Sequence, residues 1–108
     1  MEATIWHNPR CSKSRAALAL LRERGAAVTV VEYLRDPPSH AELTQMLARA
    51  GLSARQALRA DAPRFDADAA ALDAIAADPS LIERPFVATE RGAALCRPPE
   101  RVLSLLEN

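Results

Sequence analysis

The sequence predicts an α/β fold, a small four-stranded mixed sheet with helices packed against it. Two observations support this prediction. The first part of the chain reads as strand, helix and strand, and the last part reads as two strands and a helix. Two strands joined through a helix by short connections run parallel, whereas two strands joined by a tight turn form an antiparallel hairpin. We expect one domain over residues 1–108, with a helical insertion at about residues 39–82 between the two halves.

The first half of the chain alternates apolar strands with an amphipathic helix. Residues 3–6 read as a strand. From Ser12 to about Arg24 the apolar residues recur at helical spacing, and Gly25 suits the C-terminal cap of this helix. Residues 28–31 are Val-Thr-Val-Val, a β-branched run that is typical of a strand buried on both faces.

A proline-rich break at residues 36–38 separates the second strand from the next helix. Ser39 and Glu42 have the spacing of a capping box, in which each residue satisfies the backbone N–H of the other. The helix is expected to stop at Gly51. Its inward face would carry four apolar residues: Leu43, Met46, Leu47 and Ala50.

Residues 53–82 are rich in alanine and read as helical. We expect a short helix at residues 53–58. A second helix at residues 70–77, with Leu72 and Ile75 facing inward, would end before Asp78 and Pro79.

The end of the chain predicts a hairpin followed by a helix. Residues 84–89 read as a strand entered through a proline, residues 90–92 as a tight turn and residues 93–96 as a short strand. Pro98-Pro99-Glu100 would open the last helix, because proline is favoured in the first helical turn. Its inward residues would be Val102, Leu103 and Leu106.

The composition narrows the possible function classes. The chain has 108 residues, 49% of them hydrophobic and 26% charged, with a formal net charge of +0. A neutral chain gives no support to broad nucleic-acid binding, and no apolar stretch approaches the roughly 18 residues of a membrane span. Only two cysteines are present, too few and too far apart for a disulfide scaffold or a zinc site. We therefore expect a cytoplasmic protein with reduced thiols, no signal peptide, no bound metal, and neither nucleic acid nor membrane as a partner.

Cys11 lies where the first strand gives way to the first helix. Backbone N–H groups in a first helical turn lack intrahelical partners, so this end of the helix carries partial positive charge and suits an anion. Arg10, Lys13 and Arg15 add positive charge, and His7 lies four residues upstream. Such surroundings lower a thiol pKa from about 8.5 to roughly 3.5–7.5. A lone cysteine is more often a small buried hydrophobe, but these polar, basic neighbours favour a reactive thiolate beside a site for a small anion.

Three arginines are candidates for binding that anion. Arg84 and Arg97 each precede a proline, which favours extended backbone and would hold both at strand ends. Arg59 ends the expected short helix. A guanidinium is a planar fork of five donors that can bind an oxyanion through paired hydrogen bonds. The Arg84–Pro85 bond is also a candidate for the cis form. The alternative is that these arginines form surface ion pairs with carboxylates nearby in sequence: Glu83, Asp61 and Glu100.

These segments together resemble a known family. Residues 7–15 read His-Asn-Pro-x-Cys-x-x-Ser-Arg, and the other matching segments are residues 33–34, 37–39, 57–59, 83–85 and 95–98. The pattern is similar to that of the glutaredoxin-coupled arsenate reductases, which have a thioredoxin-like fold with a helical insertion. The chain looks more like a shorter branch of that family, with Cys-Ser-Lys-Ser and Arg-Pro-Pro-Glu. Well-characterised members have Gly-Thr at Ser12-Lys13 and a longer C-terminal tail.

The resemblance implies a reaction and its reductants. Cys11 would attack arsenate to form a covalent thiol–arsenic(V) adduct. Glutathione would then attack, arsenite would leave, and glutaredoxin would clear the mixed disulfide on Cys11. Glutathione would act as a co-substrate, with no tightly bound organic cofactor and no metal.

The resemblance also implies roles for the residues around the thiol. Arg59, Arg84 and Arg97 would hold the oxyanion. His7 would favour the thiolate. Ser14 would be a catalytic residue that supports the loop, and Arg15 would support the loop and help to bind the oxyanion.

Two other functions are compatible with the sequence. One is a glutaredoxin-like thiol exchange enzyme that acts on glutathionylated proteins. The other is a non-enzymatic redox regulator that binds RNA polymerase. Such regulators typically carry a Cys-x-x-Cys pair, whereas this chain has Ser14 at the second position, which disfavours that function.

Cys96 has two possible roles. It could resolve an oxidised Cys11 through an internal disulfide, which requires Cα atoms within roughly 7 Å of each other. Because Cys96 lies in a short apolar strand, we expect a buried structural thiol instead.

Overall fold

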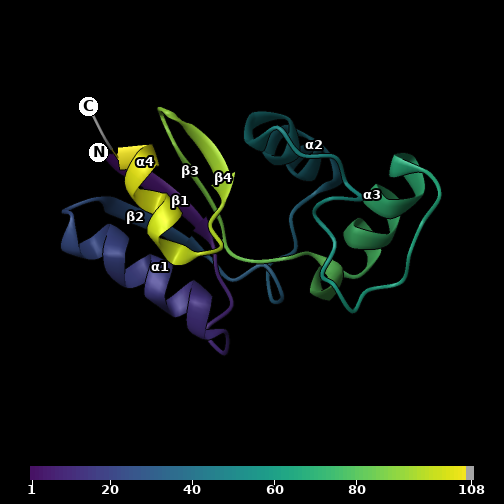
Figure 1. The fold of residues 1–108 in the computed structure, drawn as a ribbon, viewed down its shortest axis with the longest axis horizontal. Coiled ribbons are helices and arrows are strands. Elements are labelled where there is room, and N and C mark those ends of the chain that lie inside the picture. The colour runs from purple at the N-terminus through teal and green to yellow at the C-terminus, as the bar shows by residue number, and fades with distance from the viewer. Residues whose placement is uncertain (107–108) are drawn as a thin grey trace.

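The strands form one four-stranded mixed sheet with the order β2–β1–β3–β4 in the computed structural model (Figure 1). β1 (Glu2–Trp6) pairs in parallel with β2 (Ala27–Val31) and antiparallel with β3 (Phe86–Thr89). β3 pairs antiparallel with β4 (Gly92–Leu95) across a tight turn. A parallel unit and an antiparallel hairpin thus share one sheet, which confirms the predicted fold class.

The structure describes residues 1–106, and helices cover both faces of the sheet. Figure 1 shows α1 and α4 next to each other on one side, α2 beside the hairpin and α3 farthest from the sheet. No helix among the described residues is both long and apolar enough to cross a membrane. The bounds are α1 (Ser12–Glu23), α2 (His40–Ala50), α3 (Asp68–Ala77), α4 (Val102–Leu106) and two 3₁₀ turns, η1 (Pro79–Leu81) and η2 (Pro99–Arg101).

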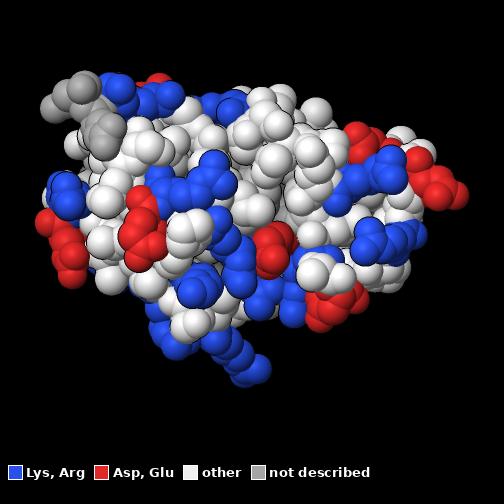
Figure 2. Space-filling model, viewed as in Figure 1, with Lys and Arg blue, Asp and Glu red and all other residues white. Residues whose placement is uncertain are grey.

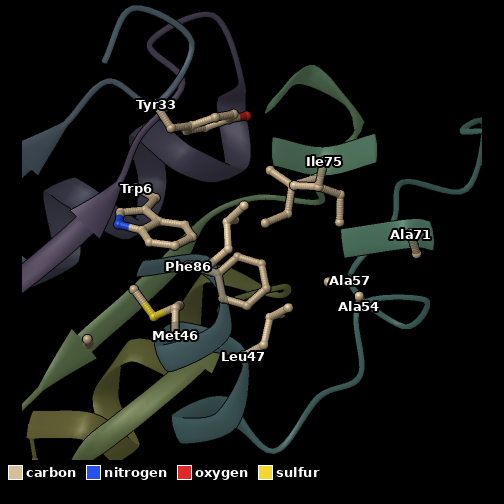
Figure 3. Packing of buried hydrophobic residues seen from close by; sticks show 12 residues of the cluster. Trp6, Tyr33, Met46, Leu47, Ala54, Ala57, Ala71, Ile75 and Phe86 are labelled. Atoms are coloured by element: carbon tan, nitrogen blue, oxygen red, sulfur yellow. The ribbon is translucent and has the colours of Figure 1, made fainter. Parts of the chain in front are cut away.

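Successive side chains of a strand point to opposite faces of the sheet, so neighbouring residues enter different cores. Ile5 and Val87 are fully buried against α1 and α4. Trp6 and Phe86 point the other way, into a cluster with α2 and α3, and their ring centroids lie 5.9 Å apart. Figure 3 shows Phe86 in the middle of this second cluster, with the ring of Tyr33 at its margin. The sheet is therefore buried on both sides.

The predicted helix ends are confirmed. Ser39 and Glu42 form the capping box at the start of α2. Gly25, just after α1, and Gly51, after α2, adopt positive φ angles of 77° and 69°. These left-handed conformations suit glycine, which has no Cβ to clash with the backbone.

The prediction that β2 is buried on both faces is wrong. β2 lies at an edge of the sheet and has β1 as its only strand neighbour among the described residues. Thr29 and Val30 are exposed, whereas Val28 packs toward the core with α1 and Val31 toward the core with α2. A β-branched run indicates a strand but does not distinguish a central strand from an edge strand.

The predicted short helix at residues 53–58 is also wrong, because this segment forms turns. Leu58 makes an isolated antiparallel bridge with Ile82, and the N–H of Arg59 donates to the carbonyl oxygen of Leu81 at 2.9 Å. Backbone groups that a helix would satisfy locally are satisfied here by a distant segment. Pairing across this bridge outweighs the helix propensity of alanine.

The inward faces of the last two helices differ partly from the prediction. In α3, Ile75 is buried as expected, while Leu72 is half-buried. The final helix begins with the 3₁₀ turn η2, which winds more tightly than an α-helix and so shifts the inward face. Val102 is fully buried as expected, but the other buried residue is Leu105, and two residues expected inward are half-buried: Leu103 and Leu106.

Candidate active site

Cys11 is the N-cap residue of α1, at the carboxyl end of β1. Its backbone is extended, with φ −93° and ψ 121°, and its N–H donates to the carbonyl oxygen of Asn8 at 3.0 Å. The turn at residues 8–10 therefore ends at the cysteine, and the helix begins directly after it. The side chain is largely buried, with 9% of its surface exposed. This position sets the sulfur against the free N–H groups of the first helical turn.

The surroundings of Cys11 favour the thiolate. Burial alone would raise the pKa of the thiol. The backbone N–H of Ser14, the guanidinium of Arg84 and the backbone N–H of Lys13 all stabilise the charged form, so the pKa lies below its ordinary value. Hydrogen bonds to a charged group and a nearby opposite charge both favour ionisation.

Arg84 is the arginine whose charge acts on the Cys11 thiol. The side chain of Arg84 is only 19% exposed. Burial alone would lower the pKa of Arg84, but the nearby Cys11 raises it, so the two charged groups stabilise each other. The Nε–H of Arg84 is buried and has no hydrogen-bond partner among the described residues. Because this donor atom is buried, it is not open to a molecule from solution; the guanidinium of Arg84 acts instead on the Cys11 thiolate.

Arg97 contacts the backbone of Arg84 and the side chain of Glu83. Its Nη1 donates to the backbone oxygen of Arg84 at 3.1 Å, and its Nε lies 3.8 Å from Oε2 of Glu83. The other carboxylate oxygen of Glu83 lies 3.5 Å from Nη1 of Arg84. Glu83 thus bridges both guanidinium groups. From the sequence, Glu83 was expected only as an ion-pair partner on the surface. Its side chain is mostly buried, with 21% of its surface exposed.

Arg59 lies next to this pair but is engaged with a carboxylate. Its Nε is 3.3 Å from Oδ1 of Asp61, the surface ion pair that was the alternative for this residue. The bridge between Leu58 and Ile82 brings Arg59 beside the segment that leads to Arg84. Arg97 thus contacts Arg84, Arg59 lies beside the segment that leads to Arg84, and the charge of Arg84 acts on the thiol.

His7 and Ser14 form the buried support of the cysteine loop. Nδ1 of His7 lies 2.7 Å from Oγ of Ser14, and the N–H of Asn8 donates to the same oxygen at 3.0 Å. Burial lowers the pKa of His7, which favours the neutral imidazole. The contacts of His7 therefore place it as a support of the loop, and its neutral form does not supply the direct charge that the sequence suggested. Arg15 also supports the loop, since its Nη1 donates to the carbonyl oxygen of Pro9 at 2.9 Å.

Tyr33 is a site residue that the sequence reasoning missed. It is 2% exposed, and burial raises the pKa of its hydroxyl, opposed by the charge of Arg84 and by a hydrogen bond with Asn8. The charges of Cys11 and Arg59 also act on this hydroxyl. One signal could have found it: Tyr33 follows β2 as Cys11 follows β1, and the carboxyl ends of parallel strands meet at one edge of a sheet.

The surface over this site is basic although the chain is neutral. Figure 2 shows Lys and Arg side chains gathered on the lower middle of the face, where Figure 1 places the N-terminal end of α1. A patch of one charge attracts the opposite charge from solution. The arrangement can bind a small oxyanion beside a nucleophilic sulfur.

Cys96 lies in a different environment. It is fully buried in the core with α1 and α4, and burial raises the pKa of its thiol to about 12. Both Cys11 and Cys96 are free thiols in the structure. The Arg84–Pro85 and Arg97–Pro98 peptide bonds are both cis, of which the first was the candidate from sequence.

Residues 6–105 match the ArsC family. The chain is 48% identical to the arsenate reductase of Rhizobium meliloti (strain 1021), over 98% of this chain and 82% of the relative. It is 47% identical to the arsenate reductase of Neisseria meningitidis serogroup B (strain MC58), over 97% of this chain and 98% of the relative. Its fold matches a solved arsenate reductase from Vibrio cholerae with a TM-score of 0.90, at 39% identity over 97% of this chain and 98% of that one.

Proposed function

Because this chain belongs to the ArsC family, we propose that it is an oxidoreductase that reduces arsenate to arsenite, with Cys11 as the nucleophile. The observation that carries this proposal is the pairing of Cys11 with Arg84. The thiol of Cys11 lies at the start of α1 with a lowered pKa, and the guanidinium of Arg84 stabilises its charged form. Cysteine nucleophiles require a thiolate, and reactions of oxyanions require donors placed in advance.

In the first step, the thiolate of Cys11 attacks arsenic(V) and an oxygen of arsenate leaves as water after protonation. Arg84 would bind the oxyanion directly, and Arg59 and Arg97 would add positive charge on either side. The support for these roles is the contact of Arg97 with the Arg84 carbonyl and with Glu83. Positive groups placed before the reaction stabilise charge that moves onto the leaving oxygen.

In the second step, glutathione attacks the adduct. Joining the sulfurs of glutathione and Cys11 as a disulfide releases two electrons, which reduce arsenic(V) to arsenic(III), and arsenite leaves. Glutaredoxin then takes the glutathionyl group, which restores the Cys11 thiol. These reaction steps need no disulfide between Cys11 and Cys96. This agrees with the pKa of about 12 for the Cys96 thiol, which keeps that thiol protonated at neutral pH. It also requires the reduced thiols of the cytoplasm.

The test is steady-state reduction of arsenate by the purified protein with glutathione and glutaredoxin. The wild type should release arsenite, and Cys11→Ser should reduce the rate by at least about 10³-fold, because the hydroxyl is a far weaker nucleophile than a thiolate. Cys96→Ala is the matched control and should keep the rate within about twofold of wild type. Full activity of Cys11→Ser, or no arsenite from the wild type, would contradict the proposal.

A further inference from the structure

A second concave site lies beside the active site, in the loop between α2 and α3, which Figure 1 draws as the teal and green trace. The cavity has a volume of about 530 Å³, within the range of sites for small molecules. Half-buried apolar side chains line it, among them Leu58 and Phe65. The exposed polar residues that line it include Arg55, Arg64 and Asp68.

The charges around this cavity are arranged for a ligand with both signs of charge. In the described part of the chain, neither Arg55 nor Arg64 has a carboxylate within ion-pair distance. Two guanidinium groups are thus available for carboxylates. Asp68 supplies one carboxylate for an ammonium group. Its Oδ1 also accepts a hydrogen bond from the backbone N–H of Arg55 at 3.2 Å, which holds the two ends of the lining segment together.

Arg59 connects the cavity to the cysteine. It lines the cavity, and its charge also acts on the buried hydroxyl of Tyr33. That hydroxyl in turn experiences the charges of Cys11 and Arg84. The cavity and the candidate active site therefore share Arg59, so a molecule bound in the cavity lies next to a residue of that site.

We propose that this cavity binds glutathione, the reductant of the reaction proposed above, on which this inference rests. Glutathione carries two carboxylates, one ammonium group and a central thiol. The two carboxylates match Arg55 and Arg64, and the ammonium group matches Asp68. Charged hydrogen bonds from guanidinium to carboxylate are among the stronger polar contacts, so a small peptide can be oriented by few of them.

The kinetic test compares the KM for glutathione with the KM for arsenate. Arg55→Gln and Arg64→Gln should each raise the KM for glutathione about tenfold, while the KM for arsenate stays within twofold. Arg24→Gln, an exposed arginine beyond the far end of α1, is the matched control and should leave both values unchanged. Equal KM values for glutathione in the two variants and in Arg24→Gln would overturn the inference and leave the proposed function standing.

A binding test separates failure of the site from failure of the function. S-methylglutathione cannot react with arsenic, so its affinity can be measured by NMR titration of the wild-type protein whether or not arsenate is turned over. The titration should shift residues of the cavity, and Arg55→Gln and Arg64→Gln should weaken binding about tenfold. Shifts confined to other surfaces, or affinities equal to that of Arg24→Gln, would contradict the cavity assignment.

Discussion

Cys11 and Cys96 are both buried, yet the structure gives their thiols opposite properties. Burial disfavours the thiolate at both positions. At Cys11 it is outweighed by N–H groups at the start of α1 and by Arg84, and the pKa is lowered. At Cys96, which packs among apolar side chains, the charge of Arg101 opposes the effect of burial but does not outweigh it, and the pKa rises to about 12.

The comparison shows which surroundings separate a thiol with a lowered pKa from one with a raised pKa in this protein. Cys96 is fully buried, Cys11 keeps 9% of its surface exposed, and the polar groups that face the Cys11 sulfur add to this difference. A helix N-terminus and a guanidinium convert a buried position into one that stabilises an anion. An apolar core without such groups keeps the thiol neutral and unreactive.

Removing the guanidinium at Arg84 should produce the largest change. Arg84→Gln takes away the charge that faces both the thiolate and the oxyanion, so kcat/KM for arsenate should fall about 10²- to 10³-fold. The measurement is the rate of arsenite formation at limiting arsenate, with Arg24→Gln as the control. A loss of less than threefold would show that Arg84 is not the group that distinguishes Cys11 from Cys96.

The pH dependence of alkylation compares the two thiols directly. Only the thiolate reacts, so a lowered pKa moves the half-maximal rate to lower pH. Cys11 should react with iodoacetamide with a midpoint below that of free cysteine, about 8.5. In the native protein Cys96 should stay unmodified at neutral pH, because its pKa is about 12.

Mass spectrometry of each cysteine-containing peptide between about pH 5 and 10 follows both reactions. In Arg84→Gln the Cys11 midpoint should move upward, since one stabilising charge is lost. A wild-type midpoint at or above that of free cysteine would contradict the assignment of Cys11 as the reactive thiol.

Ser14→Ala tests the buried support of the Cys11 loop. The substitution leaves the N–H of Asn8 and Nδ1 of His7 without their shared partner. The free energy of unfolding should therefore fall by about 1–3 kcal/mol. Urea denaturation measures this change. Ser12→Ala, an exposed position in the first turn of the same helix, should change stability by less than about 0.5 kcal/mol. If both substitutions changed the free energy of unfolding equally, Ser14 would not be a support of the Cys11 loop.

Cys96→Ala should have the smallest effect. It removes one sulfur atom from the core with α1 and α4, and the cavity left behind should cost about 1 kcal/mol of unfolding free energy. Arsenate reduction should be unaffected in the same preparation. An activity loss of more than tenfold in the folded variant would show that Cys96 takes part in the reaction.

The strand and helix pattern of the two halves was predictable because it depends on local periodicity and on caps. The capping box at Ser39 and the glycine after each of the first two helices follow from rules that act over a few residues. The prediction failed at residues 53–58, where a bridge to Ile82 replaces a helix. Backbone partners that lie far along the chain cannot be recognised from local propensity.

The sequence by itself indicated the candidate cysteine and arginines of the site. Because Cys11 follows a strand and precedes a helix, the sequence places it at the N-terminus of that helix. Arg84 and Arg97 each precede a proline at a strand end. Only the tertiary structure decided how these groups act on one another. The charge of Arg84 stabilises the Cys11 thiolate, Glu83 lies within ion-pair distance of both Arg84 and Arg97, and the charges of Cys11 and Arg84 act on the hydroxyl of Tyr33. Electrostatic effects depend on distance and burial, and both are set when the sheet brings remote segments together.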